Sequence, residues 1–337
     1  MKAFEIQSFG LDSLSLVERP DPVASPFHAV VKVRAVSLNY RDLLTIEGKY
    51  NPRLAMPLIP VSDGAGEVVA VGEGVTRVKV GDRVAANFSQ KWLGGEPARA
   101  KLGASLGGPL DGMLVEYRAL NEEGLVHVPT HLTDEEAAAL PCAGVTAWNS
   151  LIKMGGLTAG ETVLVQGTGG VSIFALQFAK LAGAQVIITS SSDEKLERAK
   201  RLGADFGINY KTTPDWDKRA KELTGGIGVD HVVEVGGAGT FAKSLRAIKI
   251  GGHIGLIGNL SGNATEVNLI HILMQNVRIQ GVLVGSRDTF EAMNRSIALH
   301  HMRPVVDRVF PFEEARKAFD HMASGSHFGK VCIKLDQ

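Results

Sequence analysis

A glycine-rich turn at residues 167–170, GTGG, has the composition of a phosphate-binding loop. Residues 162–165 before it form a short apolar run that predicts a buried strand, and the residues after it repeat apolar side chains at helical spacing as far as Gly183. Gly167 allows the tight turn, and Gly169 lets a pyrophosphate approach the free N–H groups and positive dipole of the helix. The turn therefore predicts a dinucleotide site.

Ser172 occupies the third position of the G-x-G-x-x-G pattern, so the match is incomplete. Serine is still small enough for the helix to pack closely against the strand. A second apolar run, 185–189, follows at the distance expected for the second strand of a βαβ unit. This context of strand, turn, helix and strand favours a dinucleotide-binding turn over an ordinary α/β turn.

The end of the second predicted strand carries hydroxyl groups where an acidic residue would bind the 2′-hydroxyl of an NAD ribose. It reads TSSS at 189–192, and Lys195 follows shortly after. Because no carboxylate there would repel a 2′-phosphate, the sequence favours NADPH over NADH. Ser192 can also cap the next helix, and the two interpretations are compatible.

The elements around this unit keep alternating between strand and helix as far as residue 300. We expect six strands and predict an α/β fold with a doubly wound parallel sheet. The expected strands are 162–165, 185–189, 206–210, 229–235, 252–258 and 278–284, and later helices lie near 216–223, 241–247, 269–275 and 289–300.

The segments on either side of this alternating region have a different pattern of residues. Residues 1–125 contain short β-branched runs separated by glycine and proline, which indicates a mostly β domain with one helix at 41–47. Residues 89–112 read as a long loop, either a functional or oligomer contact or a solvated insertion. Residues 133–154 predict a helix that Pro141 breaks. The tail predicts a helix and a strand that return to the first domain.

Composition excludes several classes of protein. The 337 residues contain 36 Lys plus Arg and 36 Asp plus Glu, so the net charge of zero favours neither nucleic acid nor an acidic membrane. Two cysteines distant in sequence, Cys142 and Cys332, form no disulfide framework. We see no signal peptide or long apolar span, and we therefore expect a cytoplasmic protein with a small-molecule substrate.

Several motifs together resemble the medium-chain dehydrogenase/reductase superfamily over essentially the whole chain. The resemblance implies a GroES-like mostly β catalytic domain, residues 1–125, into which a Rossmann NAD(P)-binding domain, residues 126–299, is inserted, with residues 300–337 returning to the catalytic domain. It also implies a homodimer or homotetramer. The motifs are AVSLNYRDLL (35–44), IPVSDGAGEVVAVGEGV (59–75), VGDRV (80–84), LPCAGVTAWNSL (140–151), the GTGG turn and FGKVCI (328–333).

Zinc members of that superfamily hold their catalytic metal with four residues, and of these this chain keeps only the cysteine at Cys142. The corresponding positions carry Asn39, Ser62, Asp63 and Cys142, and the loop that would hold a structural zinc, 84–115, contains no cysteine. One thiol cannot supply a tetrahedral site, so we expect no zinc and interpret Cys142 as a small buried apolar residue. The chain resembles the zinc-independent branch, the quinone oxidoreductases and zinc-free alcohol dehydrogenase-like reductases.

The resemblance also implies site residues. Asn39, Tyr40 and Asp42 are the catalytic candidates near the nicotinamide, with Tyr40 the best proton donor by type; alternatively, Asn39 only caps a helix and Tyr40 packs under the nicotinamide. The cofactor candidates are Thr146, Gly167, Thr168, Gly169, Gly170, Val171, Ser190, Ser191, Lys195, Tyr210, Gly236, Gly258, Leu283 and Val284.

The function expected from these residues is NADPH-dependent reduction of a small quinone, enone, enal or activated carbonyl. One alternative is a zinc-free alcohol dehydrogenase that acts on an alcohol or aldehyde. Another is a crystallin-like protein that binds the nucleotide without turnover. The nicotinamide would supply the hydride, and the protein would contribute positioning and the exclusion of water.

Overall fold

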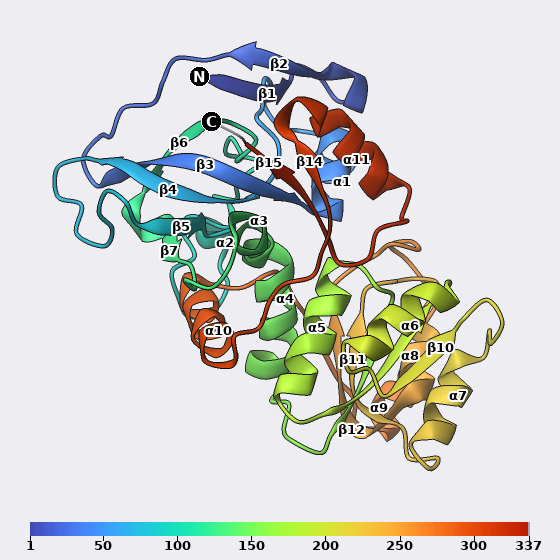
Figure 1. The fold of residues 1–337 in the computed structure, drawn as a ribbon. Helices are drawn as coiled ribbons and strands as arrows, with labels where there is room; N and C mark the ends of the chain where they lie inside the picture. The colour runs from blue at the N-terminus through green and yellow to red at the C-terminus, as the bar shows by residue number, and fades with distance from the viewer. Residues whose placement is uncertain (336–337) are drawn as a thin grey trace. The chain divides into compact units, whose positions relative to one another are not determined.

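The computed structural model describes residues 1–335, and Figure 1 shows its helices and strands. The chain forms two compact units. The first contains Met1–Val145 and the described residues from Gly285 onward, and the second is Thr146–Val284. Residues 336 and 337, the last two of the predicted C-terminal return, lie outside the described residues. The second unit is therefore an insertion in the first.

The first unit is built on a mixed sheet around the long strand β3 (His28–Leu38), whose valine-rich sequence suits a buried strand. β3 pairs antiparallel with β4 (Asp63–Val71) and with β15 (Lys330–Lys334). The sheet order is β14-β15-β3-β4-β5-β7, and β6 also pairs with β3. The remaining strands of this unit are β5 (Arg83–Ala86), β6 (Tyr117–Asn121), β7 (Leu125–His127) and β14 (Val306–Pro311), with β1 (Lys2–Ile6) and β2 (Leu14–Glu18) forming a separate pair.

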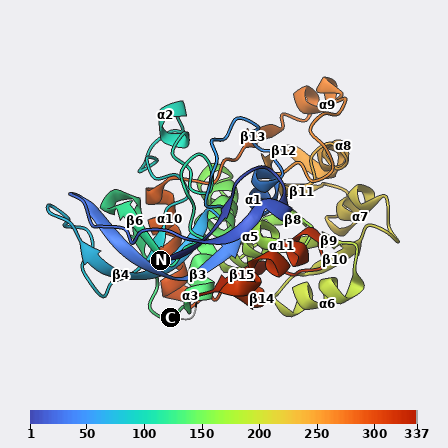
Figure 2. The same ribbon diagram turned by 90° about the horizontal axis from the view of Figure 1, so that it is seen from above.

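The end of the described chain completes this sheet. β14 and β15 run parallel, with the helix α11 (Ala315–Ala323) between them in sequence, and β15 lies beside β3 (Figure 2). Leu38 of β3 faces Val331 of β15. This register brings Asn39, which follows β3, next to Lys330, the first residue of β15.

Residues 126–145 and 285–299 on either side of the insertion belong to the first unit and not, as predicted from the sequence, to the nucleotide domain. α3 (Asp134–Ala138) packs against β3 and β4. α10 (Arg287–His300) packs against β7, where Asn294 donates to the carbonyl of His127 at 2.9 Å. The alternation of strands and helices in the sequence did not indicate that α3 and α10 pack against strands of the first unit.

The predicted helix 133–154 is irregular. Thr133 caps α3, because its hydroxyl accepts from the N–H of Glu136. Pro141 then lies at the start of a π-helical segment, Leu140–Gly144. The short helix α4 (Val145–Trp148) and a second π-helical segment, Asn149–Met154, follow. The proline, which lacks a donor, thus widens the helical path instead of ending it.

The long loop 89–112 is packed against the first unit at both ends, while residues 95–100 in its middle are exposed. It contains one short helix, α2 (Arg99–Leu102), and the Trp92 side chain is buried. The carbonyls of Trp92 and Leu93 accept from the N–H groups of Arg287 and Asp288 at the start of α10. The loop is therefore part of the packing of the first unit.

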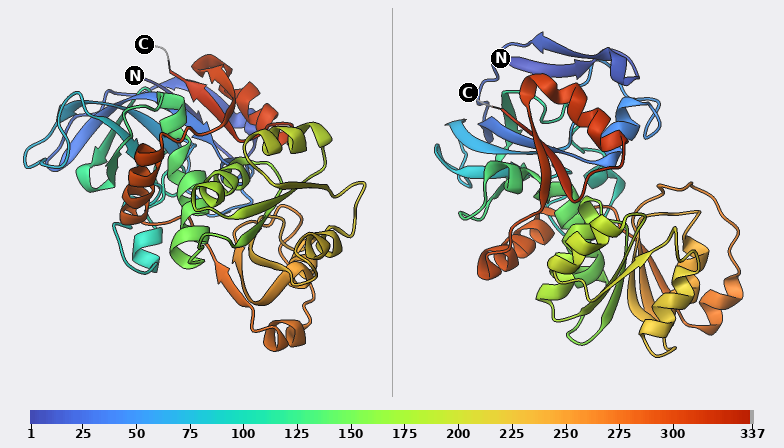
Figure 3. Two further views of the ribbon diagram at one scale, coloured as in Figure 1. Left: turned by 60° about the horizontal axis from the view of Figure 1, so that its bottom comes forward. Right: turned by 45° about the vertical axis from the view of Figure 1, so that its right-hand side comes forward.

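The second unit is the predicted doubly wound parallel sheet, which is thereby confirmed. The strand order is β10-β9-β8-β11-β12-β13. α5 and α6 cover one face, and α7, α8 and α9 cover the other (Figure 3). The strands are β8 (Thr162–Gln166), β9 (Gln185–Ser190), β10 (Phe206–Asn209), β11 (Val229–Glu234), β12 (Ile248–Leu256) and β13 (Arg278–Gly281), and the helices are α5 (Gly170–Leu181), α6 (Asp193–Arg201), α7 (Trp216–Leu223), α8 (Phe241–Ala247) and α9 (Leu269–Met274).

The order of the strands sets a switch point between β8 and β11. The chain leaves β8 in one direction toward β9 and β10, and later returns to place β11 on the other side of β8. Ligands of such sheets bind at the carboxyl ends of the strands where the direction reverses. Among residues 1–335, no helix is long and apolar enough to cross a membrane.

Two buried histidines lie in contact inside the second unit. The Nδ1 atoms of His231 (β11) and His253 (β12) are 3.4 Å apart, and Nε2 of His231 lies 3.1 Å from the Glu161 carboxylate. Burial, followed by the charges of His231 and Arg278, lowers the pKa of His253 to about 4. The folded protein therefore holds His253 in its neutral form.

We predict that His253 makes the protein less stable in mild acid. Its pKa is lower in the folded than in the unfolded chain, so the unfolded chain binds more protons and stability is lost as the pH falls from about 6.5 toward 4. The loss amounts to about 3 kcal/mol. Urea unfolding of wild type and His253→Gln between pH 7 and pH 4 measures it, and an equal pH dependence in both proteins would contradict the prediction.

Candidate active site and cofactor site

The GTGG turn joins β8 to α5 as the sequence predicted. Gly167 has φ +70°, a left-handed conformation that favours glycine, and its N–H donates to the Thr189 hydroxyl at 3.3 Å. Gly169 is the N-cap of α5, and a Cβ added there would meet no heavy atom within 4 Å. The backbone of the turn therefore has an open side, next to the first residues of a 12-residue helix. Thr168, Gly170 and Val171 complete this turn and the start of α5.

Ser172 explains the incomplete glycine pattern. Its side chain is buried, and its hydroxyl donates to the carbonyl of Gln166 at 2.6 Å. The serine thus fits where the helix approaches the strand and adds a hydrogen bond that glycine lacks. The departure from the pattern strengthens the junction between β8 and α5.

The predicted 2′-phosphate residues gather at the carboxyl ends of β9 and β10. Ser190 pairs with Asn209, and its carbonyl accepts from the N–H of Tyr210 at 3.0 Å. The Ser192 hydroxyl accepts from the N–H of Lys195 at 3.3 Å and caps α6. Ser191 lies between the two strand ends and this cap, so the cap and a phosphate site are compatible. Contact of these residues with a cofactor remains a prediction.

The predicted residues at the ends of β11 and β12 hold two loops together. A Cβ at Gly258 would lie 2.5 Å from the Val235 carbonyl oxygen, and one at Gly236 would lie 2.3 Å from the Thr240 hydroxyl. These glycines are therefore required by close packing, whether or not a ligand is bound. Beyond β13, Leu283 is half-exposed, and the carbonyl of Val284 accepts from the Asn149 side chain at 2.7 Å, while Thr146 is buried.

The catalytic candidates lie in the first unit, where β3 ends and α1 (Tyr40–Ile46) begins. The N–H of Asn39 donates to the Asp42 carboxylate at 2.8 Å, and the N–H of Ser62 donates to the same carboxylate at 3.3 Å. Asp42 is fully buried, and this burial, opposed by Arg41, raises its pKa to about 6. Asp42 thus secures the start of α1, and contact with a nicotinamide remains a prediction for it.

Asn39 is the N-cap residue of α1 and forms a capping box with Asp42, and its side chain is also held by a lysine that was not among the predicted site residues. Lys330 is buried, and its Nζ donates to Asn39 Oδ1 at 2.5 Å and to the carbonyl of Leu38 at 2.8 Å. Asn39 Nδ2 donates to the Ser62 hydroxyl at 3.4 Å. Because the ammonium can only donate, it fixes the orientation of the amide. Lys330 is the lysine of the FGKVCI motif (328–333), so this motif could have indicated that the residue belongs to the site.

Tyr40 differs from its neighbours. Its side chain is 46% exposed, and within residues 1–335 its hydroxyl makes no hydrogen bond. The neighbouring Arg41 is anchored, since its guanidinium donates to the carbonyls of Leu106 and Gly108. Of the three catalytic candidates, Tyr40 is therefore the one whose polar group can reach a ligand without breaking an existing contact.

The four positions that correspond to zinc ligands do lie together. The Ser62 hydroxyl donates to Asp63 Oδ1 at 2.8 Å, and the N–H of Cys142 donates to Asp63 Oδ2 at 3.0 Å. Desolvation raises the pKa of the Cys142 thiol, which disfavours the thiolate that zinc requires. Asn39 already binds the Lys330 ammonium. Residues 1–335 contain no group of three or more His, Cys, Asp or Glu arranged for a metal, and this set of donors does not fit zinc.

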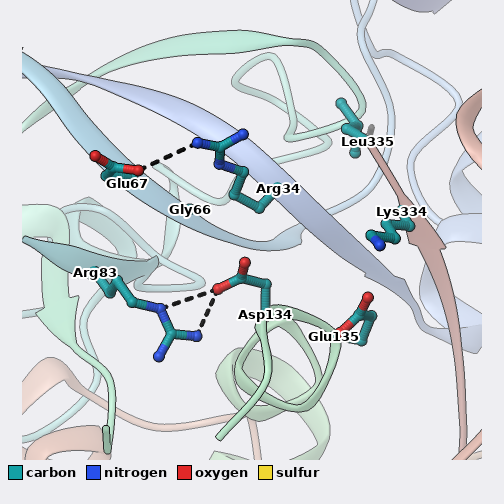
Figure 4. A pocket seen from close by; sticks show the side chains of 8 residues that line it. All are labelled: Arg34, Gly66, Glu67, Arg83, Asp134, Glu135, Lys334 and Leu335. Carbon is teal, nitrogen blue, oxygen red and sulfur yellow. Dashed lines mark hydrogen bonds and ion pairs between the residues drawn. The ribbon is translucent and has the colours of Figure 1, made fainter. Parts of the chain in front are cut away.

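A cavity of about 350 Å³ in the first unit contains none of the predicted site residues (Figure 4). Its charged groups face one another: Arg34 lies 3.2 Å from Glu67, and Arg83 donates to Asp134 through two nitrogens. The rest of its wall is formed by Gly66, Glu135, Lys334 and Leu335. With these charges already paired, we do not assign the active site to this cavity.

Comparison with known protein families agrees with this architecture. Residues 25–130 match the alcohol dehydrogenase GroES-like domain, and residues 170–298 match the zinc-binding dehydrogenase domain. The first match confirms the predicted GroES-like character of the mostly β unit, and the second covers most of the doubly wound sheet.

Individual proteins are similar over nearly the full chain. A zinc-type alcohol dehydrogenase-like protein of Schizosaccharomyces pombe is 45% identical over 334 residues, 97% of this chain and 96% of its own. An acryloyl-coenzyme A reductase of Metallosphaera sedula is 31% identical, covering 94% and 95%. Among solved structures, an NAD-dependent alcohol dehydrogenase is 34% identical with a TM-score of 0.91 and complete coverage of both chains. A mycobacterial protein complexed with NADPH is 28% identical with a TM-score of 0.83, covering 99% and 100%.

We predict that Asn39 and Lys330 stabilise the first unit as a pair. Asn39→Ala removes an acceptor from a buried ammonium and lowers the free energy of unfolding by about 2 kcal/mol. In Asn39→Ala/Lys330→Met the two losses are less than additive, with a coupling of about 1–2 kcal/mol. Denaturant unfolding of the two single variants and the double variant measures the coupling, and simple additivity would show that the hydrogen bond contributes nothing.

Proposed function

Because the chain belongs to the medium-chain dehydrogenase/reductase superfamily, and its homologues are NAD(P)-dependent oxidoreductases, we propose that it uses NADPH to reduce a small quinone, enone, enal or activated carbonyl without zinc. The observation that carries the proposal is the open GTGG turn at the start of α5, beside a strand end that has hydroxyl groups and no carboxylate. A dinucleotide pyrophosphate and a 2′-phosphate both suit these groups.

Preference for NADPH is supported by the end of β9. Ser190 and Ser191 offer hydroxyl donors, and Lys195 and Tyr210 lie at the same strand ends. One similar structure contains NADPH, whereas another is an NAD-dependent enzyme, so the family accommodates both cofactors. The absence of an acidic residue at 189–192 favours NADPH for this chain.

The substrate class is supported by a relative and by the polar groups of the first unit. The similar acryloyl-coenzyme A reductase acts, by its name, on a conjugated alkene. Reduction of a conjugated alkene or carbonyl places negative charge on an oxygen, which donors must stabilise. The alternative, a zinc-free alcohol dehydrogenase, is supported by the similar NAD-dependent alcohol dehydrogenase.

The roles of the protein groups follow from their contacts. When bound, the nicotinamide supplies the hydride. Tyr40 is the candidate proton donor, since its exposed hydroxyl is unpartnered within residues 1–335. Asn39 Oδ1 accepts from Lys330, and its Nδ2 donates to Ser62 and Asp63, so Asn39 would have to give up one of these contacts to orient a substrate or ribose. Without a fitting metal site, these donors and water must stabilise the developing charge.

We further propose that the protein is a homodimer through the edge of the second unit. β13 is the last strand of its sheet, so one edge can pair with β13 of a second copy. Beside it in sequence, α9 exposes four large apolar side chains by more than half: Leu269, Ile270, Leu273 and Met274. A monomeric mass in solution at micromolar concentration would contradict the proposal, and Leu273→Asp should weaken the dimer.

The function is tested by NADPH oxidation with a panel of quinones, enals, enones, aldehydes and alcohols. The proposal expects turnover of at least one electron-poor alkene, quinone or carbonyl. Oxidation of alcohols alone would favour the alcohol dehydrogenase. NADPH binding without oxidation by any compound would favour a nucleotide-binding protein with no enzymatic role.

We predict that Lys195→Ala weakens NADPH binding about ten- to a hundredfold, because it removes a charged donor from the 2′-phosphate site. NADH binding should hardly change, since NADH has no 2′-phosphate. Lys200→Ala is the matched control on the same helix, because Lys200 lies in the last turn of α6, away from the strand end that carries Ser190 and Ser191. Fluorescence titration with both cofactors measures the effect, and equal NADPH affinity in Lys195→Ala and wild type would refute the assignment.

We predict that Tyr40→Phe slows the hydride step by roughly a hundredfold to ten-thousandfold while leaving thermal stability nearly unchanged. The side chain is exposed and the lost hydroxyl has no hydrogen bond within residues 1–335, so the stability cost is small. Single-turnover NADPH oxidation and thermal melting separate the two effects. A normal rate would remove Tyr40 from the mechanism.

A further inference from the structure

Glu234, the last residue of β11, is fully buried and accepts hydrogen bonds from the loop that follows it. Its Oε1 accepts from the N–H groups of Gly236 and Gly237 at 2.9 and 3.0 Å, and from the Thr240 hydroxyl at 2.6 Å. Three donors from one loop therefore converge on one carboxylate oxygen. The conformation of residues 235–240 depends on that oxygen.

The other oxygen of the same carboxylate connects to β8. Glu234 Oε2 accepts from Gln166 Nε2 at 2.7 Å and from the Ser244 hydroxyl. Gln166 is the last residue of β8 and directly precedes the GTGG turn. The carboxylate thus links the turn after β8 to the loop after β11.

Gln166 strengthens the same connection. Its Oε1 accepts from the N–H groups of Val235 and Gly236, both at 3.3 Å. Its own carbonyl accepts from Ser172 at the start of α5. All polar atoms of the Gln166 side chain are used to join these two segments.

β8 and β11 are neighbouring parallel strands on either side of the switch point, and their carboxyl ends border the crevice where such sheets bind ligands. We propose that Glu234 is a positioning residue for the dinucleotide. Together with Gln166, it fixes the distance between the GTGG turn and the Gly236–Gly237 loop. The inference rests on the proposed cofactor and adds a residue that does not itself touch it.

As long as residue 166 is a glutamine, the donors around residue 234 require a carboxylate there. Five donors converge on Glu234, and a carboxylate only accepts. A glutamine of the same shape would direct an NH2 group toward some of these donors, and it would therefore open the connection between the loop and β8. A second substitution at position 166 can restore these hydrogen bonds, because Gln166 is the amide that donates to the Glu234 carboxylate.

In the repaired variant, Gln166→Glu/Glu234→Gln, the two side chains exchange roles. A carboxylate at position 166 can accept from the N–H groups of Val235 and Gly236, which now donate to Gln166, and from the side-chain amide at position 234. The amide oxygen at 234 can accept from the loop. The double variant keeps the numbers of donors and acceptors and should restore the connection.

The test compares NADPH dissociation constants, measured by fluorescence titration well below each melting temperature. Glu234→Gln should weaken NADPH binding roughly ten- to a hundredfold, and Gln166→Glu/Glu234→Gln should recover most of that loss. Asp217→Asn is the matched control: Asp217 is also a buried carboxylate of this unit, but it pairs with Arg246. It should lower the melting temperature without changing the dissociation constant.

Unchanged NADPH affinity in Glu234→Gln, together with a lower melting temperature, would overturn the inference and leave Glu234 a purely structural residue. Failure of the double variant to recover affinity would also overturn it. If Glu234→Gln does not fold, Thr240→Val removes one loop donor and should still weaken binding. Wild-type protein that binds no dinucleotide would instead disprove the proposed function, so the two failures are distinguishable.

Discussion

The arrangement of the two loops at the switch point of the parallel sheet depends on one buried carboxylate, that of Glu234. The carboxyl ends of β8 and β11 carry backbone N–H groups that must find partners while the turn before α5 stays open to a ligand. Glu234 and Gln166 satisfy those of residues 235–237 from inside the unit. Among the described residues Glu234 makes no ion pair, and its charge is stabilised by hydrogen bonds alone.

In the first unit, a buried cation, the Lys330 ammonium, donates to polar groups at the end of β3. Lys330 enters through the register of β15 against β3 and binds Asn39, while Asp42 and Asp63 accept from backbone N–H groups nearby. The positions of zinc ligands in related enzymes are therefore filled by an internally satisfied polar network. The Lys330 ammonium in that network disfavours the binding of a second cation, because like charges repel. It also fixes the side-chain amide of Asn39, the residue directly before Tyr40.

Local patterns were sufficient to predict the turn at Gly167 and the cap at Ser192, because each depends on residues within one βαβ unit. The doubly wound sheet was predictable because strands and helices keep alternating along the sequence, and each strand shows its own apolar run. The domain boundaries were displaced, because α3 and α10 pack on strands far away in sequence. Lys330 and Glu234 were missed for the same reason. Lys330 binds a residue 291 positions away, and Glu234 binds one 68 positions away, so no spacing pattern indicates either pair.

In the proposed reaction, this chain transfers a hydride from NADPH with groups of its own and no zinc. The most direct test is single-turnover oxidation of NADPH deuterated at the transferred position, after exhaustive dialysis against a chelator and analysis for metal. We expect a primary isotope effect and an undiminished rate in protein that contains no zinc. Loss of the hydride step on dialysis, and its recovery with one equivalent of zinc per chain, would show instead that the enzyme depends on zinc.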